Sequence, residues 1–143
     1  GDEIEGDAAE TAAKHMNVLR SHPKGQNPVI LISGGETTVK VQGNGRGGRN
    51  AHYILSAMLE AAGDAHIYGI ACDTDGIDGS EDNAGAFFTP VTMNVSKEKG
   101  LSAQDALENT DSYGFFKQID HLVMTGPTRT NVNDFRALIW IPQ

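Results

Sequence analysis

Short apolar runs that alternate with helical patterns are the feature that most restricts the fold of this chain. The run PVILIS at 28–33 is continuous and rich in β-branched residues, which is typical of a strand covered on both faces. Similar runs lie at 65–72, 121–126 and 135–142. Because helical patterns separate most of them, we predict an α/β domain with a mostly parallel sheet covered by helices. The last two strands could form an antiparallel pair.

Helical segments are marked by apolar residues three and four positions apart. The first spans 6–23, where Asp7 can cap the helix and Pro23 ends it. The second covers 51–62 and closes at Gly63. Other segments are a short edge strand at 39–41, weak or short helices at 89–99 and 102–109, and a turn or short helix at 112–118.

Length and charge restrict the class of protein. The 143 residues suit one domain, which we place at 5–143. A formal net charge of −8 argues against a nucleic-acid or anionic-membrane partner. No apolar run is long enough to span a bilayer, and the single cysteine, Cys72, indicates a reducing cytoplasm. The chain begins at Gly1 without a methionine, so we expect a piece of a longer protein, with an oligomer possible.

Four polar loops follow predicted strands and carry most of the chemically useful residues. They are GGETT at 34–38, GNGRGGRN at 43–50, DTDGIDGSED at 73–82 and TGPTRTN at 125–131. In open α/β sheets, ligands bind at the carboxyl ends of the strands. We therefore predict that the functional site lies among these loops.

The second loop has the spacing of an anion cradle. Gly43, Gly45 and Gly48 fit G-x-G-x-x-G ahead of a helix, whose first N–H groups suit a phosphate or carboxylate. A dinucleotide site would also need an acidic residue about 20 positions on, roughly where Asp73 lies. The alternative is a tight connection that needs glycine only for its backbone shape.

Arginines favour the anion interpretation over a nicotinamide site. Three of the five in the chain, Arg46, Arg49 and Arg129, lie in these loops. The guanidinium group offers a fork of donors for phosphate or carboxylate oxygens. The alternative is that they form structural salt bridges with carboxylates such as Asp73 or Asp75.

The acidic loop admits two interpretations. Position six from Asp73 is Asp78 instead of the glycine of an EF-hand, which excludes that motif. Asp73, Asp75 and Asp78 remain candidates to hold Mg²⁺ with a phosphorylated ligand, or they accept N–H groups in an acidic turn. His52 lies one turn into the helix that follows the glycine loop, and it either approaches a bound anion or is a surface histidine. Cys72 is predicted to be a buried, inert thiol.

Several motifs together resemble one family, the MOFRL domain that forms the C-terminal part of glycerate 2-kinases, a family often labelled hydroxypyruvate reductase. The matching motifs, in order, are LISGGETTVKV with GNGRGGRN, TDGIDG, DNAGAF, DSYGFF and TGPTRTNVND. The resemblance runs from about Glu5 to Ile139.

The resemblance implies a two-domain cytoplasmic enzyme that uses ATP and Mg²⁺ to convert D-glycerate to 2-phosphoglycerate. Its active site would lie between this domain and a larger N-terminal nucleotide-binding domain. A catalytic lysine would come from that domain, so we expect this chain alone to be inactive. The family usually has glycine where this chain has Arg129, which leaves the role of this arginine open.

Site residues follow from the resemblance by position. Arg46 and Arg49 would be catalytic, and Asp75 and Asp78 would hold the metal. The residues that would bind the small anionic substrate are Gly45, Gly47, Gly48, Asn50, Thr128, Asn131 and Asn133. Gly34, Gly35 and Glu36 are further candidates, because the GGETT loop could expose N–H groups and hydroxyls to a substrate; the alternative for this loop is a hairpin turn.

Two other functions stay open at this stage. The family label suggests a hydroxypyruvate reductase that uses NAD(P)H, and the short chain suggests a stand-alone anion-binding domain. Two loop arginines favour phosphate, whereas an acidic ribose ligand without arginines would favour NAD(P)H.

Overall fold

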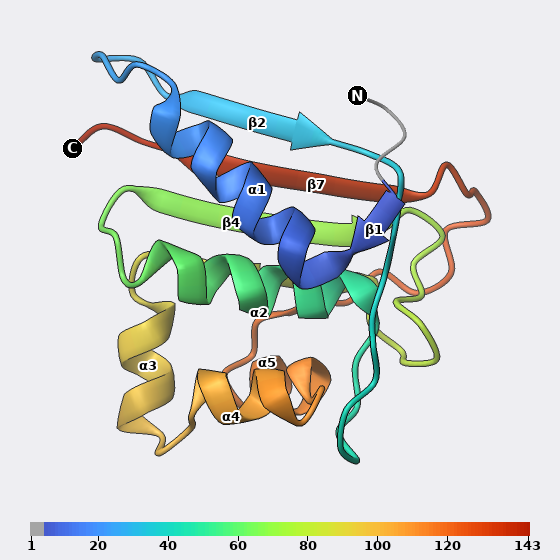
Figure 1. The fold of residues 1–143 in the computed structure, drawn as a ribbon. Helices are drawn as coiled ribbons and strands as arrows, with labels where there is room; N and C mark the ends of the chain where they lie inside the picture. Colours follow the sequence, from blue (N-terminus) through green and yellow to red (C-terminus); the bar gives the residue numbers. More distant parts are fainter. Residues whose placement is uncertain (1–4) are drawn as a thin grey trace.

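The fold is a two-layer arrangement of helices on one face of an antiparallel sheet, seen in a computed structural model that describes residues 5–143 (Figure 1). The main sheet has the strand order β2-β7-β4-β5-β6. These strands are β2 (Val29–Ser33), β4 (Ile67–Asp73), β5 (Gly85–Phe88), β6 (Leu122–Val123) and β7 (Asp134–Trp140). A second, two-stranded sheet pairs β1 (Glu5–Asp7) with β3 (Glu36–Thr38) in parallel.

The prediction of a mostly parallel main sheet was wrong. β2 and β4 run in the same direction, as an alternation of strands and helices requires, but they are not neighbours. The last strand, β7, lies between them and pairs with both in the antiparallel sense. The expected pairing of the last two strands is also wrong, because β6 pairs with β5.

Two shorter elements differ from the prediction as well. β5 was not predicted, and it continues the antiparallel sheet beyond β4. The edge strand expected at 39–41 lies earlier, at β3, where its register places Thr37 opposite Gly6.

The helices lie where the apolar spacing places them. They are α1 (Ala8–Ser21), α2 (Arg49–Ala61), α3 (Thr92–Glu98), α4 (Ala103–Glu108) and α5 (Ser112–Gln118). The predicted cap of α1 is confirmed, because an Asp7 carboxylate oxygen accepts the N–H groups of Ala9 and Glu10 at 2.9 and 3.1 Å. Within the described residues, no helix is long and apolar enough to cross a membrane.

The core lies between the helices and one face of the sheet. α1 and α2 lie in front of the strands, and α3, α4 and α5 continue that layer beside α2 (Figure 1). Leu138 of β7 and Phe88 of β5 are buried against these helices. The largest buried apolar side chains of the helical layer are Met16, Leu19, Tyr53, Ile54, Leu55, Met58 and Phe116.

Candidate functional site

The predicted loops gather at one edge of the main sheet, although the sheet is antiparallel. β2 and β4 end at this edge and β7 begins there, at the right of Figure 1. The register places Asp73 directly opposite Asp134. The Asp134 N–H donates to the Gly35 carbonyl at 3.0 Å, and the Thr74 N–H donates to the Asn133 carbonyl at 3.1 Å. Three of the four loops are thereby connected.

Asp134 is the centre of a buried hydrogen-bond network at this edge. Its carboxylate accepts Arg49 Nε at 3.0 and 3.1 Å, Arg136 Nη1 at 3.0 Å and Asn50 Nδ2 at 2.9 Å. The Arg136 side chain is completely buried and also donates to the Ser33 hydroxyl at 3.1 Å. Buried charges are tolerated where they are paired and hydrogen-bonded in this way. The network therefore holds Arg49 in one place.

Arg49 projects from the first position of α2 and is bound by three carboxylates. Besides Asp134, its Nη2 lies 2.8 Å from Asp73 and its Nη1 lies 3.1 Å from Glu36. Burial by itself would lower the pKa of this guanidinium. The carboxylates of Asp134, Asp73 and Glu36 outweigh burial and raise the pKa above its ordinary value. Arg49 is thus a permanent cation whose partners are already protein carboxylates.

Glu36 differs from the other two partners because it faces solvent. Its side chain is 57% exposed, whereas those of Asp73 and Asp134 are 7% and 0% exposed. Exposed ion pairs contribute about 0–1 kcal/mol, so Glu36 is the partner that an incoming anion can most easily replace. The outer side of Arg49 is therefore the part of this network that is available to a ligand.

The start of α2 already binds an anion, and that anion is Asp78. The completely buried Asp78 carboxylate accepts the N–H groups of Asn50 and Ala51 at 2.9 and 2.8 Å. Burial raises the pKa of Asp78 to about 6, although those N–H groups oppose the shift. A Cβ at Gly48 would lie 2.4 Å from Asp78 Cγ, so glycine is needed for this close approach.

The rest of the glycine loop packs against the segment between α4 and α5. The Gly45 N–H donates to the Asn109 carbonyl at 3.0 Å, and the Arg46 N–H donates to Asp111 at 2.9 Å. These contacts explain Gly45 through close packing, a reason that the sequence did not offer, whereas Gly43 and Gly47 have the positive φ that the alternative expected. A substrate role for Gly45, Gly47 and Gly48 stays a prediction.

Arg46 and Arg49 point to different partners. The Arg46 guanidinium lies over the Tyr113 ring at 4.7 Å and pairs with Glu81. Its side chain is 63% exposed. Both arginines therefore form salt bridges with neighbouring carboxylates, which the sequence had offered as the alternative. Only Arg49 belongs to the buried network, so we place the candidate anion site at Arg49.

The loop at 125–131 is hydrogen-bonded to the acidic loop at 73–82. The Thr128 hydroxyl donates to the Thr74 carbonyl at 2.5 Å, and its N–H donates to the Asp75 carbonyl at 3.0 Å. Asn131 accepts the Asn133 N–H at 3.0 Å. Thr128, Asn131 and Asn133 are exposed at this edge, and their substrate roles stay predictions.

Metal binding finds limited support among the described residues. Asp75 accepts the Ile77 N–H at 2.8 Å within an acidic turn, and Asp78 is occupied by the start of α2. Across residues 5–143, no three His, Cys, Asp or Glu side chains form a group suited to a metal ion. The metal roles of Asp75 and Asp78 stay predictions.

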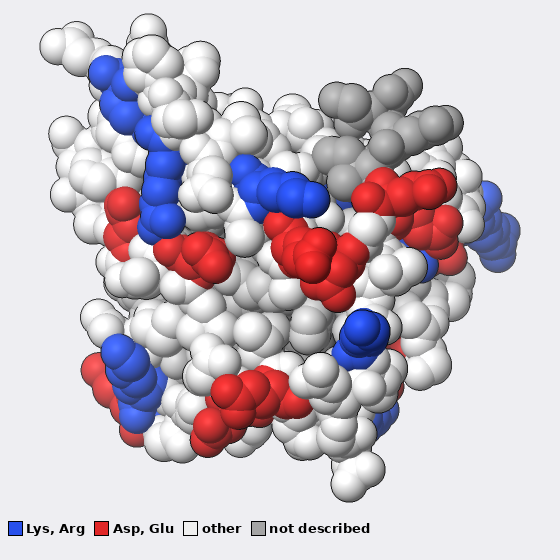
Figure 2. All heavy atoms as spheres, in the orientation of Figure 1, with Lys and Arg blue, Asp and Glu red and all other residues white. Residues whose placement is uncertain are grey.

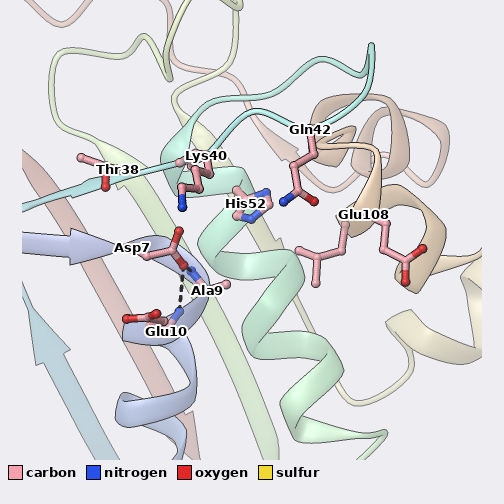
Figure 3. Close-up of a pocket in the computed structure, with 10 residues that line it drawn as sticks. Asp7, Ala9, Glu10, Thr38, Lys40, Gln42, His52 and Glu108 are labelled. Carbon is pink, nitrogen blue, oxygen red and sulfur yellow. Dashed lines mark hydrogen bonds between the residues drawn. The ribbon is translucent and has the colours of Figure 1, made fainter.

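His52 is not a surface histidine, contrary to the simpler expectation. It is 8% exposed at the wall of a pocket of about 640 Å³ between α1, β3, α2 and α4 (Figure 3). Burial lowers the pKa of His52, and the charge of Asp7 opposes that shift. Asp7, Glu10 and Glu108 outweigh Lys40 along this pocket, so its charge does not suit an anionic substrate.

Two residues of the network were missed by sequence reasoning. Asp134 was noted only as part of the last loop, and Arg136 was taken as part of a closing strand. The available signal was an arginine inside the apolar run FRALIWIP, because a charge at a strand position facing a core requires a buried partner. Cys72 was expected to be buried and inert. It is only partly buried, but that burial raises the pKa of its thiol to about 12, which disfavours the reactive thiolate.

The fold and the site define an α/β domain in which buried carboxylates anchor an arginine at a polar edge of the sheet. The chain belongs to the MOFRL family, whose model matches residues 29–134.

Relatives share most of this chain but are much longer. A putative hydroxypyruvate reductase of Agrobacterium vitis is 42% identical over 97% of the chain, which covers 38% of that protein. The D-glycerate 2-kinase of Thermotoga maritima is 43% identical over 76% of the chain and 26% of that protein. The solved structure of a Thermotoga maritima glycerate kinase matches 99% of the chain with a TM-score of 0.87 and 36% identity, over 35% of its own length. The chain thus spans roughly a quarter to two-fifths of these relatives.

Proposed function

We propose that this chain is the MOFRL domain of a glycerate 2-kinase. It would bind glycerate and the transferring phosphoryl group in a cleft formed with a nucleotide-binding domain from the remaining part of a longer protein. The observation that carries the proposal is Arg49, held by buried Asp73 and Asp134 and paired on its outer side with exposed Glu36. The names of the relatives, glycerate kinase and D-glycerate 2-kinase, support the same activity.

Arg49 would act by positioning and by neutralising charge. Phosphoryl transfer spreads negative charge over the phosphoryl oxygens, and a fixed cation stabilises that charge more effectively than a mobile one. Asp73 and Asp134 hold the guanidinium from the buried side, while Arg136 offsets part of the charge of Asp134. The substrate anion would replace Glu36 on the outer side.

Residues of the two connected loops would then orient the substrate. Thr128, Asn131 and Asn133 carry hydroxyl and amide groups at the exposed edge, beside Asp75. Such groups suit the hydroxyls of glycerate, while Arg49 suits its carboxylate or the phosphoryl group.

ATP and Mg²⁺ would be bound mainly by other parts of the protein. The chain has no phosphate-binding loop of the G-x-x-x-x-G-K-[ST] type. Mg²⁺ usually needs one or two carboxylates besides phosphate oxygens, and Asp75 and Asp78 stay the candidates in this chain, although within residues 5–143 no group of three ligating side chains forms a complete site.

The reductase alternative rests on the name of the Agrobacterium vitis relatives. It would need an acidic side chain free to bind the ribose of NAD(P)H, and Asp73 is the residue at that place. Asp73 instead binds Arg49 through one oxygen and the Asp75 N–H through the other. This occupied carboxylate favours the kinase.

The proposal is tested in a polypeptide that joins this chain to the upstream two-thirds of the Thermotoga maritima D-glycerate 2-kinase. We expect it to form 2-phosphoglycerate from ATP and D-glycerate, and we expect the 143-residue chain alone to form none. A second assay uses hydroxypyruvate and NADH. Oxidation of NADH without any phosphoglycerate would refute the kinase in favour of the reductase.

A further inference from the structure

One face of the main sheet is apolar, and no helix of residues 5–143 lies over it (Figure 1). In the register of the sheet, Ile30 pairs with Ile139, and Ile32 is in line with Ala137 and Ile70. These side chains point away from the face where Leu138 meets the helices. Ile30 and Ile32 are 56% and 66% exposed, and Phe135 is 42% exposed. We call this surface the open sheet face.

The open sheet face differs in composition from the helical side of the molecule. At the paired positions of β2, β7, β4 and β5, none of the side chains on this face is charged. Figure 2 shows that the helical side carries acidic and basic residues spread among uncharged ones. An antiparallel sheet that faces water normally alternates apolar and polar residues. The open sheet face therefore has the composition of a buried surface.

The size of this face helps to decide what covers it. Four strands about 4.8 Å apart, each with about five residues rising about 3.3 Å, form an area of roughly 300 Å². Stable association of free chains usually buries about 800 Å² per partner. Interfaces between domains of one polypeptide bury about 600–1,500 Å² in total, or about 300–750 Å² per side. The face is large enough for a tethered partner and small for a second copy.

We propose that the open sheet face is covered by another segment of the same polypeptide, from the part that the relatives carry beyond their match to this chain. This chain covers 24–38% of the curated relatives, so those proteins have ample further chain to supply such a segment. The segment would present a flat, uncharged, apolar surface to Ile30, Ile32 and Phe135. The open sheet face is separate from the loop edge that carries Arg49, so this proposal does not depend on the kinase activity.

Thiol labelling tests the proposal with little disturbance of the fold. A single cysteine is placed by Ile32→Cys in a Cys72→Ser background, and the control is Val91→Cys, a β-branched residue in the helical layer that is 60% exposed. Labelling by a maleimide is followed by peptide mass spectrometry, in the 143-residue chain and in the chain joined to the upstream Thermotoga maritima segment. We expect the two sites to react at similar rates in the short chain. In the joined protein, labelling of Ile32→Cys falls at least tenfold, while that of Val91→Cys changes less than threefold.

Two results would overturn the proposal. Equal labelling of Ile32→Cys in the short and joined proteins would mean that the face stays open. Protection in the short chain that increases with protein concentration would assign the face to a second copy. Because the joined protein could fail to fold, the same labelling is repeated in the intact Thermotoga maritima enzyme, with a cysteine at the position that is structurally equivalent to Ile32. Labelling of that cysteine as fast as in the unfolded enzyme would also overturn the proposal.

Discussion

Replacing the Asp134 carboxylate by an amide tests the buried network at its centre. Asp134→Asn keeps the size of the side chain but leaves Arg136, which is completely buried, without its carboxylate partner. Breaking a buried ion pair by removing one partner costs about 3–5 kcal/mol, because the remaining charge is uncompensated. We expect a loss of about 3–4 kcal/mol in the free energy of unfolding, taking the lower part of that range because Asn50 and an amide oxygen at position 134 can still form hydrogen bonds.

Urea unfolding followed by the fluorescence of the single tryptophan, Trp140, measures this loss. The matched control is Glu108→Gln, the same carboxylate-to-amide change at an exposed residue of α4 that accepts a hydrogen bond from Gln104, and it is expected to leave the unfolding midpoint unchanged. Adding Arg136→Met to Asp134→Asn removes the uncompensated charge and should restore about 1–2 kcal/mol. A loss below about 1 kcal/mol for Asp134→Asn would refute the account of Asp134 as the centre of the network.

Three further predictions follow from single contacts. Glu36→Gln removes the exposed partner of Arg49, so in the joined protein it should tighten D-glycerate binding up to about fivefold. Isothermal titration measures this change, and weaker binding would contradict the replacement of Glu36 by substrate. The folded-state pKa of Asp78 is about 6, above its unfolded value, so its protonated form is favoured in the fold and stability is lost as pH rises from about 4 to 6. The difference in unfolding free energy between the wild type and Asp78→Asn should therefore fall by about 3 kcal/mol across that range in urea titrations, and a constant difference would contradict it. Gly48→Ala places a Cβ 2.4 Å from Asp78 Cγ and should lower the stability by about 1–3 kcal/mol in thermal unfolding. The control Gly25→Ala has open space around it and should cause no such loss. Equal effects of the two variants would exclude the close approach as the reason for glycine at position 48.

The sequence predicted local structure better than the arrangement of the strands. The helices α1 and α2 and the strands β2, β4 and β7 lie within a few residues of their predicted bounds, because apolar spacing and caps are local signals. The insertion of β7 between β2 and β4 could not be predicted, since pairing partners distant in the sequence leave no local mark. β5 was missed because its residues follow a long polar loop without a clear alternation.

The place where the polar loops gather was predicted from the sequence, but the contacts among their side chains were not. Polar residues after apolar runs correctly indicated the edge where β2 and β4 end. The roles of Arg49 and Asp78 depend on partners 24 to 85 positions away in the sequence, which only the folded sheet brings together. For that reason the sequence could offer ligand binding and internal salt bridges only as alternatives.

The rate of 2-phosphoglycerate formation by the Arg49→Lys variant of the joined protein tests the central claim most directly. Lysine keeps the charge but cannot bind two carboxylates and a substrate anion with one planar fork, so we expect the rate to fall at least about a hundredfold. Arg20→Lys, on the exposed side of α1, should leave the rate unchanged. An undiminished rate for a folded Arg49→Lys variant would contradict the assignment of the anion site to Arg49.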